Sequence, residues 1–287
     1  MFRRAHLSGS SNIIAKMYRI SDEEFKELRD FVHENYGIFL RDEKKALVLS
    51  RFQRYMMDNN FYSFREYLDF LKKSENKEAL TTLVNKITTN YTFFMRESEH
   101  FKYFRDTVLP YLKAKNSNKD MRIWSAGCSS GEEPYTLAMI IDEFFHGQKE
   151  NWDTKILATD ISEEVLSTAR KGVYPLDKLS DLPNAWRVNY FKIYDKSNLV
   201  VSEKIREEVI FRSFNLMEKV FPFKKKFDVI FCRNVMIYFD EKTKNMLVQR
   251  FFDNTNLGGY LFIGHSESIN RTITKYKNVI PSVYRKE

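Results

Sequence analysis

The hydrophobic positions of residues 17–86 recur with the spacing of amphipathic helices. Phe25, Leu28 and Val32 fall on one face of a first helix that begins after Ser21, since residues three or four positions apart are neighbours on a helix. Segments with the same spacing begin near residues 42, 63 and 80. Because no proline and no alternating pattern interrupts them, residues 17–86 are expected to form a small all-helical domain.

Beyond residue 120 the pattern changes to short apolar runs that alternate with helical segments. This βαβ alternation predicts an α/β domain built on a parallel sheet. The run at 227–232 is apolar almost throughout, which is typical of a strand buried on both faces. The expected strands are 121–124, 155–159, 227–232, 260–263 and an edge strand at 282–286, and the expected helices are 101–113, 162–171, 243–254 and one that begins near Pro134.

Residues 172–212 interrupt this alternation. They hold a helical piece and two short apolar runs, at 199–201 and 209–211, which are expected to be antiparallel strands. We therefore expect a small β-subdomain inserted in an α/β domain that spans residues 87–287. Residues 1–16 are polar with little periodicity, and we expect a disordered leader or an expression remnant there.

The composition is that of a globular protein with an excess of positive charge. Of 287 residues, 43% are hydrophobic, and no run approaches the roughly 20 apolar residues that span a bilayer. We therefore expect a cytoplasmic monomer without membrane insertion. Two cysteines make no disulfide framework and the five histidines lack metal-ligand spacing, so no metal is expected. The net charge of +8 favours an acidic partner.

A loop of small residues follows the first expected strand. Gly127, Ser129, Ser130 and Gly131 lie between the run at 121–124 and a helix. At such a strand end, small residues let a nucleotide-like ligand approach the backbone. The loop has no Gly-x-Gly-x-x-Gly and no Walker lysine, so nothing specifically favours a pyrophosphate.

The charges around this loop favour a different ligand. Glu132 and Glu133 place negative charge at the helix start, where they would repel a phosphate, so a cationic or zwitterionic cofactor fits better than a phosphate. The alternative is a plain turn that binds nothing. Asp160, Asn215 and Asn234 each lie close behind an apolar run. In nucleotide folds a carboxylate placed like Asp160 accepts hydrogen bonds from ribose hydroxyls, with a helix cap as the equal alternative.

Six short motifs follow one another between residues 90 and 239, and the similarity that they belong to covers about residues 21–284. They are Asn90-Tyr91-Thr92, Arg96-Glu97, the run from Gly127 to Tyr135, Ala158-Thr159-Asp160-Ile161-Ser162, Phe214-Asn215-Leu216 and the run from Cys232 to Phe239. Together they resemble the CheR family, the S-adenosylmethionine-dependent methyltransferases that esterify glutamates of bacterial chemoreceptors. The resemblance implies a Rossmann-like methyltransferase domain with an inserted antiparallel β-subdomain, preceded by an all-helical domain.

The resemblance also assigns roles to individual residues. It implies S-adenosyl-L-methionine as cofactor, S-adenosyl-L-homocysteine as product, and the acidic methylation helices of chemoreceptors as substrate. Arg96 and Tyr238 are the residues implied for catalysis, with Tyr238 near the transferred methyl group. The implied cofactor contacts are Asn90, Thr92 and Arg96 with Gly127 and Glu132 at the methionine end, Asp160 at the ribose, and Asn215, Leu216, Asn234 and Val235 around the adenine.

The implied chemistry needs placement more than acid–base groups. A glutamate with a pKa of about 4.3 is ionised at neutral pH and is already a nucleophile, so no general base is required. In-line placement of the two reactants and a counter-charge are required instead. Arg96 would supply that charge either to the carboxylate of the cofactor or to that of the substrate, and both assignments stay open.

A basic stripe is expected on the second helix of the helical domain, over residues 42–57. The residues expected to face the core are Ala46, Leu49, Phe52 and Met56. Those expected on the other side are Arg41, Lys44, Arg51 and Arg54. By the resemblance this stripe docks the methylation helix of a receptor, and the alternative is an ordinary solvated face.

Two departures from the family pattern stand out. Phe93-Phe94-Met95 keeps the spacing and bulk of the residues that the family has there, so little effect is expected. Residues 194–198 lack the glycines of members that bind a receptor-tail pentapeptide, which argues against such tethering.

Three other interpretations compete with this one. A nucleic-acid methyltransferase would suit the positive charge, but the prolines of an Asn-Pro-Pro-Tyr motif are missing between Asn234 and Tyr238, and no nucleic-acid partner is expected. A cofactor-sensing module without turnover is disfavoured by the presence of Arg96 together with Tyr238. Cys128 and Cys232 at neighbouring strand ends would suit a redox switch, while two reduced thiols are the simpler expectation.

Overall fold

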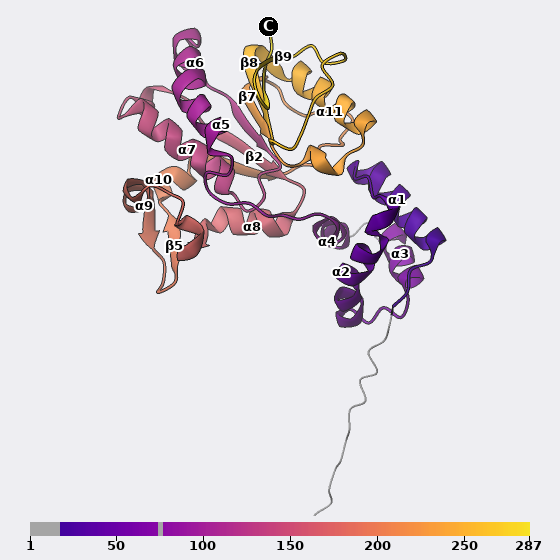
Figure 1. Cartoon of the computed structure of the whole chain (residues 1–287). Helices are drawn as coiled ribbons and strands as arrows, with labels where there is room; N and C mark the ends of the chain where they lie inside the picture. The colour runs from indigo at the N-terminus through magenta and orange to yellow at the C-terminus, as the bar shows by residue number, and fades with distance from the viewer. Residues whose placement is uncertain (1–17, 74–76) are drawn as a thin grey trace, which may run out of the picture.

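The computed structural model describes residues 18–73 and 77–287 (Figure 1). The expected leader, residues 1–16, lies outside the described residues. The predicted fold class is confirmed, because a helical domain precedes an α/β domain with a mostly parallel sheet and a second, small antiparallel sheet. Among the described helices, none combines the length and the apolar character needed to cross a membrane.

The helical domain packs four α-helices around one core. They are α1 (Asp22–Tyr36), α2 (Lys45–Asp58), α3 (Phe64–Lys73) and α4 (Lys77–Ile87), with a 3-10 turn, η1 (Asp42–Lys44), before α2. Ser21 and Glu24 form a capping box at the start of α1, and Gly37 ends that helix at φ 68°.

The core face of α2 differs from the predicted one. Val48, Phe52 and Met56 are buried, Leu49 is half-buried and Ala46 is exposed. The helical turn of about 100° per residue is the physical reason, because it places Val48 about 40° and Ala46 about 120° from Phe52 around the axis of α2.

A sheet of seven strands forms the centre of the second domain. Its order is β6-β2-β1-β7-β8-β10-β9, in which the first five strands run parallel and β10 pairs antiparallel with both β8 and β9. The strands are β1 (Ile123–Ala126), β2 (Ile156–Asp160), β6 (Val209–Ser213), β7 (Phe227–Cys232), β8 (Thr255–Ile263), β9 (Lys277–Ile280) and β10 (Val283–Arg285). The chain order reverses between β1 and β7, and in such sheets ligands bind at this switch point.

Two strand predictions are wrong. The run at 209–211 belongs to β6, which pairs parallel with β2 in the main sheet and not antiparallel in the insertion. The run at 282–286 becomes β10, which is not an edge strand because β9 pairs along its free side. A short apolar run shows that a segment is a strand but not which neighbour its backbone meets.

Helices cover both faces of the main sheet (Figure 1). Trp124 and Ile230 point to the face covered by α11 (Glu241–Asp253), whereas Ile123 and Phe231 point to the opposite face. That opposite face is covered by α5 (Ser98–Tyr103), the π-helical turn η2 (Phe104–Val108), α6 (Leu109–Lys115), α7 (Glu132–Phe145) and α8 (Glu163–Lys171). The burial of β7 on both faces, expected from its apolar run, is confirmed.

The helix predicted over 101–113 is part of a longer helical stretch, α5 to α6, and Pro110 lies at the start of α6 inside it. A proline lacks the N–H of an α-helical hydrogen bond, and the chain passes through the π-helical turn η2 directly before it.

The remaining short elements are η3 (Lys149–Asn151) and η5 (Met236–Tyr238).

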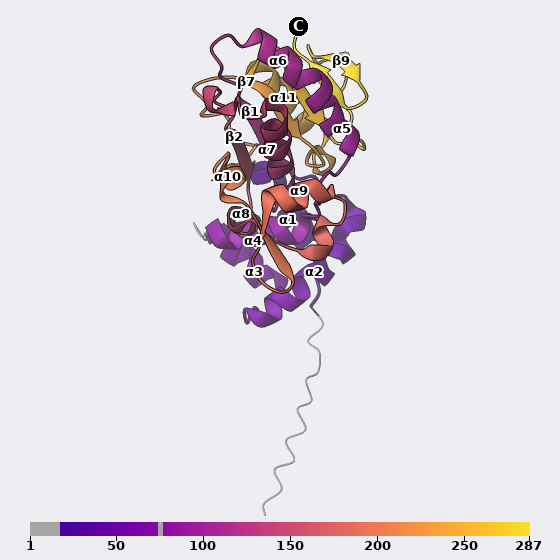
Figure 2. The ribbon, with the colours of Figure 1, turned by 90° about the vertical axis from the view of Figure 1, so that its left-hand side faces the viewer.

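The insertion forms a small sheet of order β3-β5-β4. Its elements are β3 (Val173–Pro175), η4 (Leu176–Leu179), α9 (Asn184–Tyr190), β4 (Phe191–Ile193), β5 (Asn198–Val201) and α10 (Glu203–Arg206). This β-subdomain and the helical domain both lie at the end of the molecule away from the C-terminus (Figures 1 and 2).

The helical domain packs directly against the loop that follows β7. Ile38 forms an antiparallel bridge with Phe239, and the Phe39 amide donates to the Tyr238 carbonyl at 2.8 Å. His33 Nε2 lies 2.8 Å from Asp240 Oδ2. One hydrophobic cluster continues from the helical domain to the α11 face of the sheet, so the two domains share a core.

Candidate active site

A cavity of about 460 Å³ opens at the carboxyl ends of β1, β2 and β7, at the switch point of the sheet. It brings together residues from six separate stretches of the chain, including the segment that joins the two domains. Of the predicted cofactor and catalytic residues it is lined by Asn90, Thr92, Arg96, Gly127, Asp160, Asn215, Leu216, Asn234, Val235 and Tyr238.

Glu132 is the predicted cofactor residue that does not line this cavity. Its side chain is fully buried, accepts a hydrogen bond from Ser130 Oγ at 2.7 Å and lies 3.6 Å from Lys178 Nζ of the β-subdomain. Glu133 lines the cavity instead. Successive residues of a helix point about 100° apart, so at the first turn of α7 only one of the two glutamates faces the crevice.

Asp160 ends β2 with its carboxylate held by the backbone. Oδ2 accepts from the Ser129 amide at 2.9 Å and Oδ1 accepts from the Ser162 amide at 3.0 Å. Burial raises the pKa of this carboxyl, and the backbone donors oppose that effect. Each carboxylate oxygen has two lone pairs, so the group can still accept hydrogen bonds from a ligand in the cavity.

Gly127 allows the loops after β1 and β7 to approach each other. Its φ is 88°, and a Cβ atom placed on it would lie 2.3 Å from Val235 Cγ2. Any side chain here would therefore push Val235, which lines the cavity, out of position.

Tyr238 is bound to the segment that joins the domains. Its hydroxyl accepts from the Thr89 amide at 3.0 Å and donates to the Thr89 carbonyl at 3.2 Å. The carbonyl of the next residue, Asn90, accepts a hydrogen bond from Ser129 Oγ at 3.1 Å. Arg96 Nη1 donates to the Tyr91 carbonyl at 2.7 Å. These contacts fix the stretch that forms one wall of the cavity.

A buried ionic network that the sequence analysis missed supports this wall. The Arg233 side chain is 2% exposed and lies between two carboxylates, with Nη2 3.0 Å from Glu97 Oε2 and Nη1 3.0 Å from Glu133 Oε2. Arg233 also donates to the Arg96 carbonyl, and Ser125 Oγ donates to Glu133 at 2.7 Å. Burial alone would raise the pKa of Glu97, but His100 and Arg233 outweigh it and hold that pKa well below its usual range.

The backbone around the network is strained. Met95, Glu97, Ser129 and Asn234 have φ values of 60°, 55°, 48° and 60°, in the left-handed region that residues other than glycine rarely adopt. Such conformations persist where surrounding contacts over-determine them. Arg233 stabilises the turn that carries Arg96, because it donates hydrogen bonds to both the Arg96 carbonyl and the Glu97 carboxylate.

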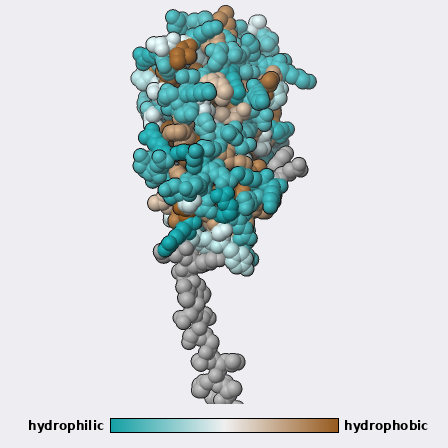
Figure 3. Space-filling model, turned by 90° about the vertical axis from the view of Figure 1, so that its right-hand side faces the viewer, coloured by the Kyte–Doolittle hydropathy of each residue, from teal (hydrophilic) through white to brown (hydrophobic). Residues whose placement is uncertain are grey.

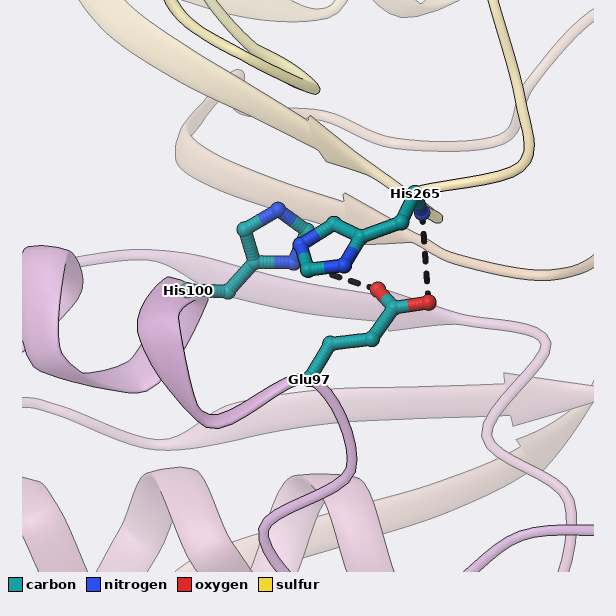
Figure 4. A group of neighbouring side chains, drawn as sticks. All are labelled: Glu97, His100 and His265. Atoms are coloured by element: carbon teal, nitrogen blue, oxygen red, sulfur yellow. Dashed lines mark hydrogen bonds and ion pairs between the residues drawn. The ribbon is translucent and has the colours of Figure 1, made fainter.

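Glu97, His100 and His265 lie together beside this network (Figure 4). Their ligand-type atoms are within 4.8 Å of one another, a proximity that the sequence spacing did not reveal. Both Glu97 oxygens are already in use, because Oε2 accepts from Arg233 at 3.0 Å and Oε1 accepts from the His265 amide at 3.2 Å and from Asn234 Nδ2 at 3.3 Å. A metal ion would compete with these donors and sit close to a guanidinium, so the group is best explained as hydrogen-bonded support.

Glu267 is a second supporting residue outside the predicted set. Its carboxylate accepts from the amides of Asn234 at 2.9 Å, Gly264 at 2.5 Å and Ile237 at 3.2 Å. It therefore holds the loop that carries Asn234, Val235 and Tyr238. A glutamate four residues behind the apolar run at 260–263 was the available signal, but its partners Asn234 and Ile237 are 33 and 30 positions away along the chain.

The predicted docking residues do not behave alike. Arg41, Lys44 and Arg54 are exposed, but the Arg51 guanidinium turns inward to the carbonyls at the end of α4. Its place in an exposed stripe is therefore a wrong prediction.

Cys128 and Cys232 are buried free thiols, and burial raises the pKa of both well above the usual value, which keeps them unreactive.

Comparison with known proteins covers nearly the whole chain. Residues 23–88 match the all-alpha domain of CheR methyltransferases, and residues 90–284 match their SAM binding domain. A chemotaxis protein methyltransferase of Borreliella burgdorferi is 44% identical over 270 residues, which is 93% of this chain and 95% of the relative. Those of Salmonella typhimurium and Escherichia coli are each 33% identical, over 96% and 91% of both chains.

The cofactor is S-adenosylmethionine, and the cavity fits it. The half-buried Asp160 carboxylate is an acceptor for hydroxyl donors, and Gly127 leaves room for Val235 to approach the loop after β1. The Arg96 side chain lines the same cavity and offers positive charge to a carboxylate. The absence of a glycine-rich phosphate loop agrees with a ligand that carries no phosphate.

Replacing Asp160 by alanine is expected to weaken cofactor binding by about 1 to 3 kcal/mol, because hydroxyl donors would lose a charged acceptor. Titration calorimetry should therefore give a Kd about 5- to 150-fold higher. Asp177→Ala, which removes an exposed carboxylate of the β-subdomain, is the control and should leave the Kd unchanged. A wild-type Kd for Asp160→Ala would contradict the placement of the ribose at Asp160.

Proposed function

We propose that this protein methylates glutamate side chains of bacterial chemoreceptors, because the chain belongs to the CheR methyltransferase family. The product is a glutamate methyl ester on a receptor that the enzyme reaches from the cytoplasm. The observation that carries the proposal is the cavity at the switch point, which gathers Asp160, Arg96 and Tyr238 beside the segment that joins the two domains. The bound cofactor supplies a methyl group on a sulfonium, which is transferred with loss of a neutral thioether.

The side chains of the cavity suit a substrate that is itself the nucleophile. A glutamate with a pKa of about 4.3 reaches the site ionised, and no proton has to be removed. The two carboxylates that line the cavity are both engaged, Asp160 by backbone amides and Glu133 by Arg233 and Ser125. Neither is needed as a general base, and the role of the protein is to orient and to balance charge.

Arg96 and Tyr238 are the residues we propose for catalysis. Arg96 donates one hydrogen bond, to the Tyr91 carbonyl, and in the described part of the chain no other hydrogen bond from its guanidinium is found. Its charge is therefore available to a carboxylate. Tyr238 places its ring at the cavity and its hydroxyl on Thr89, so it shapes the space in which the methyl group is transferred.

We propose that the acidic receptor helix docks on the outer side of the helical domain. Arg41 and Lys44 are exposed at the start of α2, and the Arg54 side chain is 92% exposed. Figure 3 shows a mostly hydrophilic surface on the side where the helical domain lies, with small hydrophobic spots between. A hydrophilic surface does not favour burial of a large apolar face, and the exposed positive charges of Arg41, Lys44 and Arg54 would steer an acidic partner.

Binding of a receptor-tail pentapeptide is not part of this proposal. Asp195 accepts from the amides of Ser197 at 2.8 Å and Asn198 at 2.9 Å. The loop between β4 and β5 is therefore closed by hydrogen bonds to its own aspartate, and the proposed docking site lies on the helical domain instead.

Incubation of the protein with methyl-labelled S-adenosylmethionine and membranes that contain chemoreceptors is expected to label the receptor protein. Mild base should release the label as methanol, because methyl esters hydrolyse and N-methyl groups do not. The Asp160→Ala protein, assayed below cofactor saturation, is the matched control with reduced labelling. Label that resists base, or label on RNA in place of receptor, would contradict the proposed function.

A further inference from the structure

Arg51 binds the end of helix α4 through its fork of N–H donors. Nη1 lies 3.1, 3.0 and 3.1 Å from the carbonyl oxygens of Lys86, Ile87 and Thr88, and Nη2 donates to Thr89 Oγ1 at 3.2 Å. The last carbonyls of a helix have no partner inside the helix and carry the negative end of its dipole. The guanidinium meets both needs, since it supplies donors and positive charge at the same place.

The segment that Arg51 holds is the wall of the cofactor cavity. Residues 88–93 all line the cavity, and the contacts follow one another along the chain. Arg51 from α2 binds Thr88 and Thr89, while Tyr238 binds the Thr89 backbone from the other domain. Thr89 is thus held between an arginine of the helical domain and a tyrosine of the methyltransferase domain.

We propose that Arg51 is a positioning residue that couples helix α2 to the cofactor site by fixing residues 88–93. Arg54, one turn further along α2, has no such contact and pairs with Asp58 at 3.7 Å on the surface. The same helix would therefore act on two sides, with Arg54 on the surface proposed to meet the partner and Arg51 on the segment that forms the cavity wall. That α2 docks the receptor rests on the proposed function, but the link from Arg51 to the cavity does not.

This coupling has a thermodynamic consequence. Any partner that shifts α2 also shifts the Arg51 anchor, and so changes the wall formed by Asn90 and Thr92. Because coupling between two binding sites is reciprocal, filling the cofactor cavity changes the affinity of α2 for its partner by the same factor. A lysine does not reproduce this arrangement, because its single nitrogen replaces only Nη1 and leaves Thr89 Oγ1 without the donor that Nη2 supplies.

The test compares Arg51→Ala and Arg51→Lys with Arg54→Ala as the matched control. We expect both Arg51 variants to raise the cofactor Kd about tenfold in calorimetry without receptor present, and Arg54→Ala to leave it unchanged. With receptor fragments, Arg54→Ala should raise the KM for receptor at low salt, while the Arg51 variants at saturating cofactor lower kcat with little change in that KM. Thermal unfolding of each variant shows whether it is folded at the assay temperature.

Three outcomes would overturn the inference. A wild-type cofactor Kd in a folded Arg51→Lys protein would mean that the contacts at α4 only stabilise the helix. A pure increase in the receptor KM would return Arg51 to the docking residues. Equal cofactor affinity of Arg51→Ala and Arg54→Ala would remove the distinction between them. Since the Kd measurement needs no methyl acceptor, failure of glutamate methylation leaves its result intact.

Discussion

Replacing Arg233 by methionine is expected to lower the free energy of unfolding by about 3 to 5 kcal/mol, the usual cost of breaking a buried ion pair from one side. Methionine fills much of the volume over the Phe101 ring, which the guanidinium covers at 5.1 Å. The loss is therefore one of charge and hydrogen bonds more than of packing. It would leave Glu97 and Glu133, whose side chains are each 14% exposed, without their shared cation.

The matched control is Arg105→Met. Arg105 also forms a short contact with a carboxylate, Asp106 at 2.6 Å, but its side chain is 48% exposed. Exposed pairs contribute about 0 to 1 kcal/mol, so denaturant unfolding should separate the two variants clearly. A loss for Arg233→Met no larger than that for Arg105→Met would show that the network does not support the fold.

The pH dependence of the free energy of unfolding is a second test of the same ionic network. In the folded protein the pKa of Glu97 is held below its value in the unfolded chain. The stabilisation that ionised Glu97 gives to the fold is therefore fully present above the unfolded pKa of about 4.3. The contribution is lost as the pH falls toward the folded pKa. Wild-type protein should therefore lose stability steeply below about pH 4.3, and Arg233→Met should lose less of it in that range.

Much of the site could be predicted because its residues lie at fixed places in the local sequence. Gly127, Asp160 and Asn234 each lie at or just after the end of a strand whose apolar run is visible, and parallel strands end at one edge of the sheet. The resemblance supplied the roles, and the geometry brings these residues to one cavity. What neither source resolved is the direction of single side chains in helices, where neighbours diverge by about 100°. Glu132 and Arg51 were misplaced for this reason.

The supporting network was beyond prediction for a different reason. Arg233 is 136 and 100 positions from its partners Glu97 and Glu133, and no periodic pattern links such distances. The parallel pairing of β6 likewise depends on where the chain returns after the β-subdomain. Local patterns specify elements and burial, whereas long-range pairing follows from the packing of the whole chain.

Replacing Arg96 by alanine is expected to lower turnover by more than about 100-fold, the scale of loss seen when reacting groups are misplaced by about an ångström. Hydrogen bonds to charged groups contribute about 1.5 to 3 kcal/mol, and the variant loses both this charge and the contact that holds the Tyr91 carbonyl. The measurement is initial rate against receptor at saturating cofactor, with the cofactor Kd determined separately. Arg96→Lys keeps the charge and should recover part of the activity but not the geometry.

Tyr238→Phe is the comparison that separates the two proposed catalytic residues. It keeps the ring in the cavity and removes the hydroxyl that binds both backbone groups of Thr89. We expect kcat to fall while the cofactor Kd stays near the wild-type value, because the change removes two hydrogen bonds of a neutral hydroxyl and leaves the ring and the four charge-assisted contacts of Arg51 in place. If Arg96→Ala and Tyr238→Phe instead lose cofactor binding equally, Tyr238 acts through the cavity wall and not at the methyl group. The chemistry would then depend on Arg96 and on placement alone.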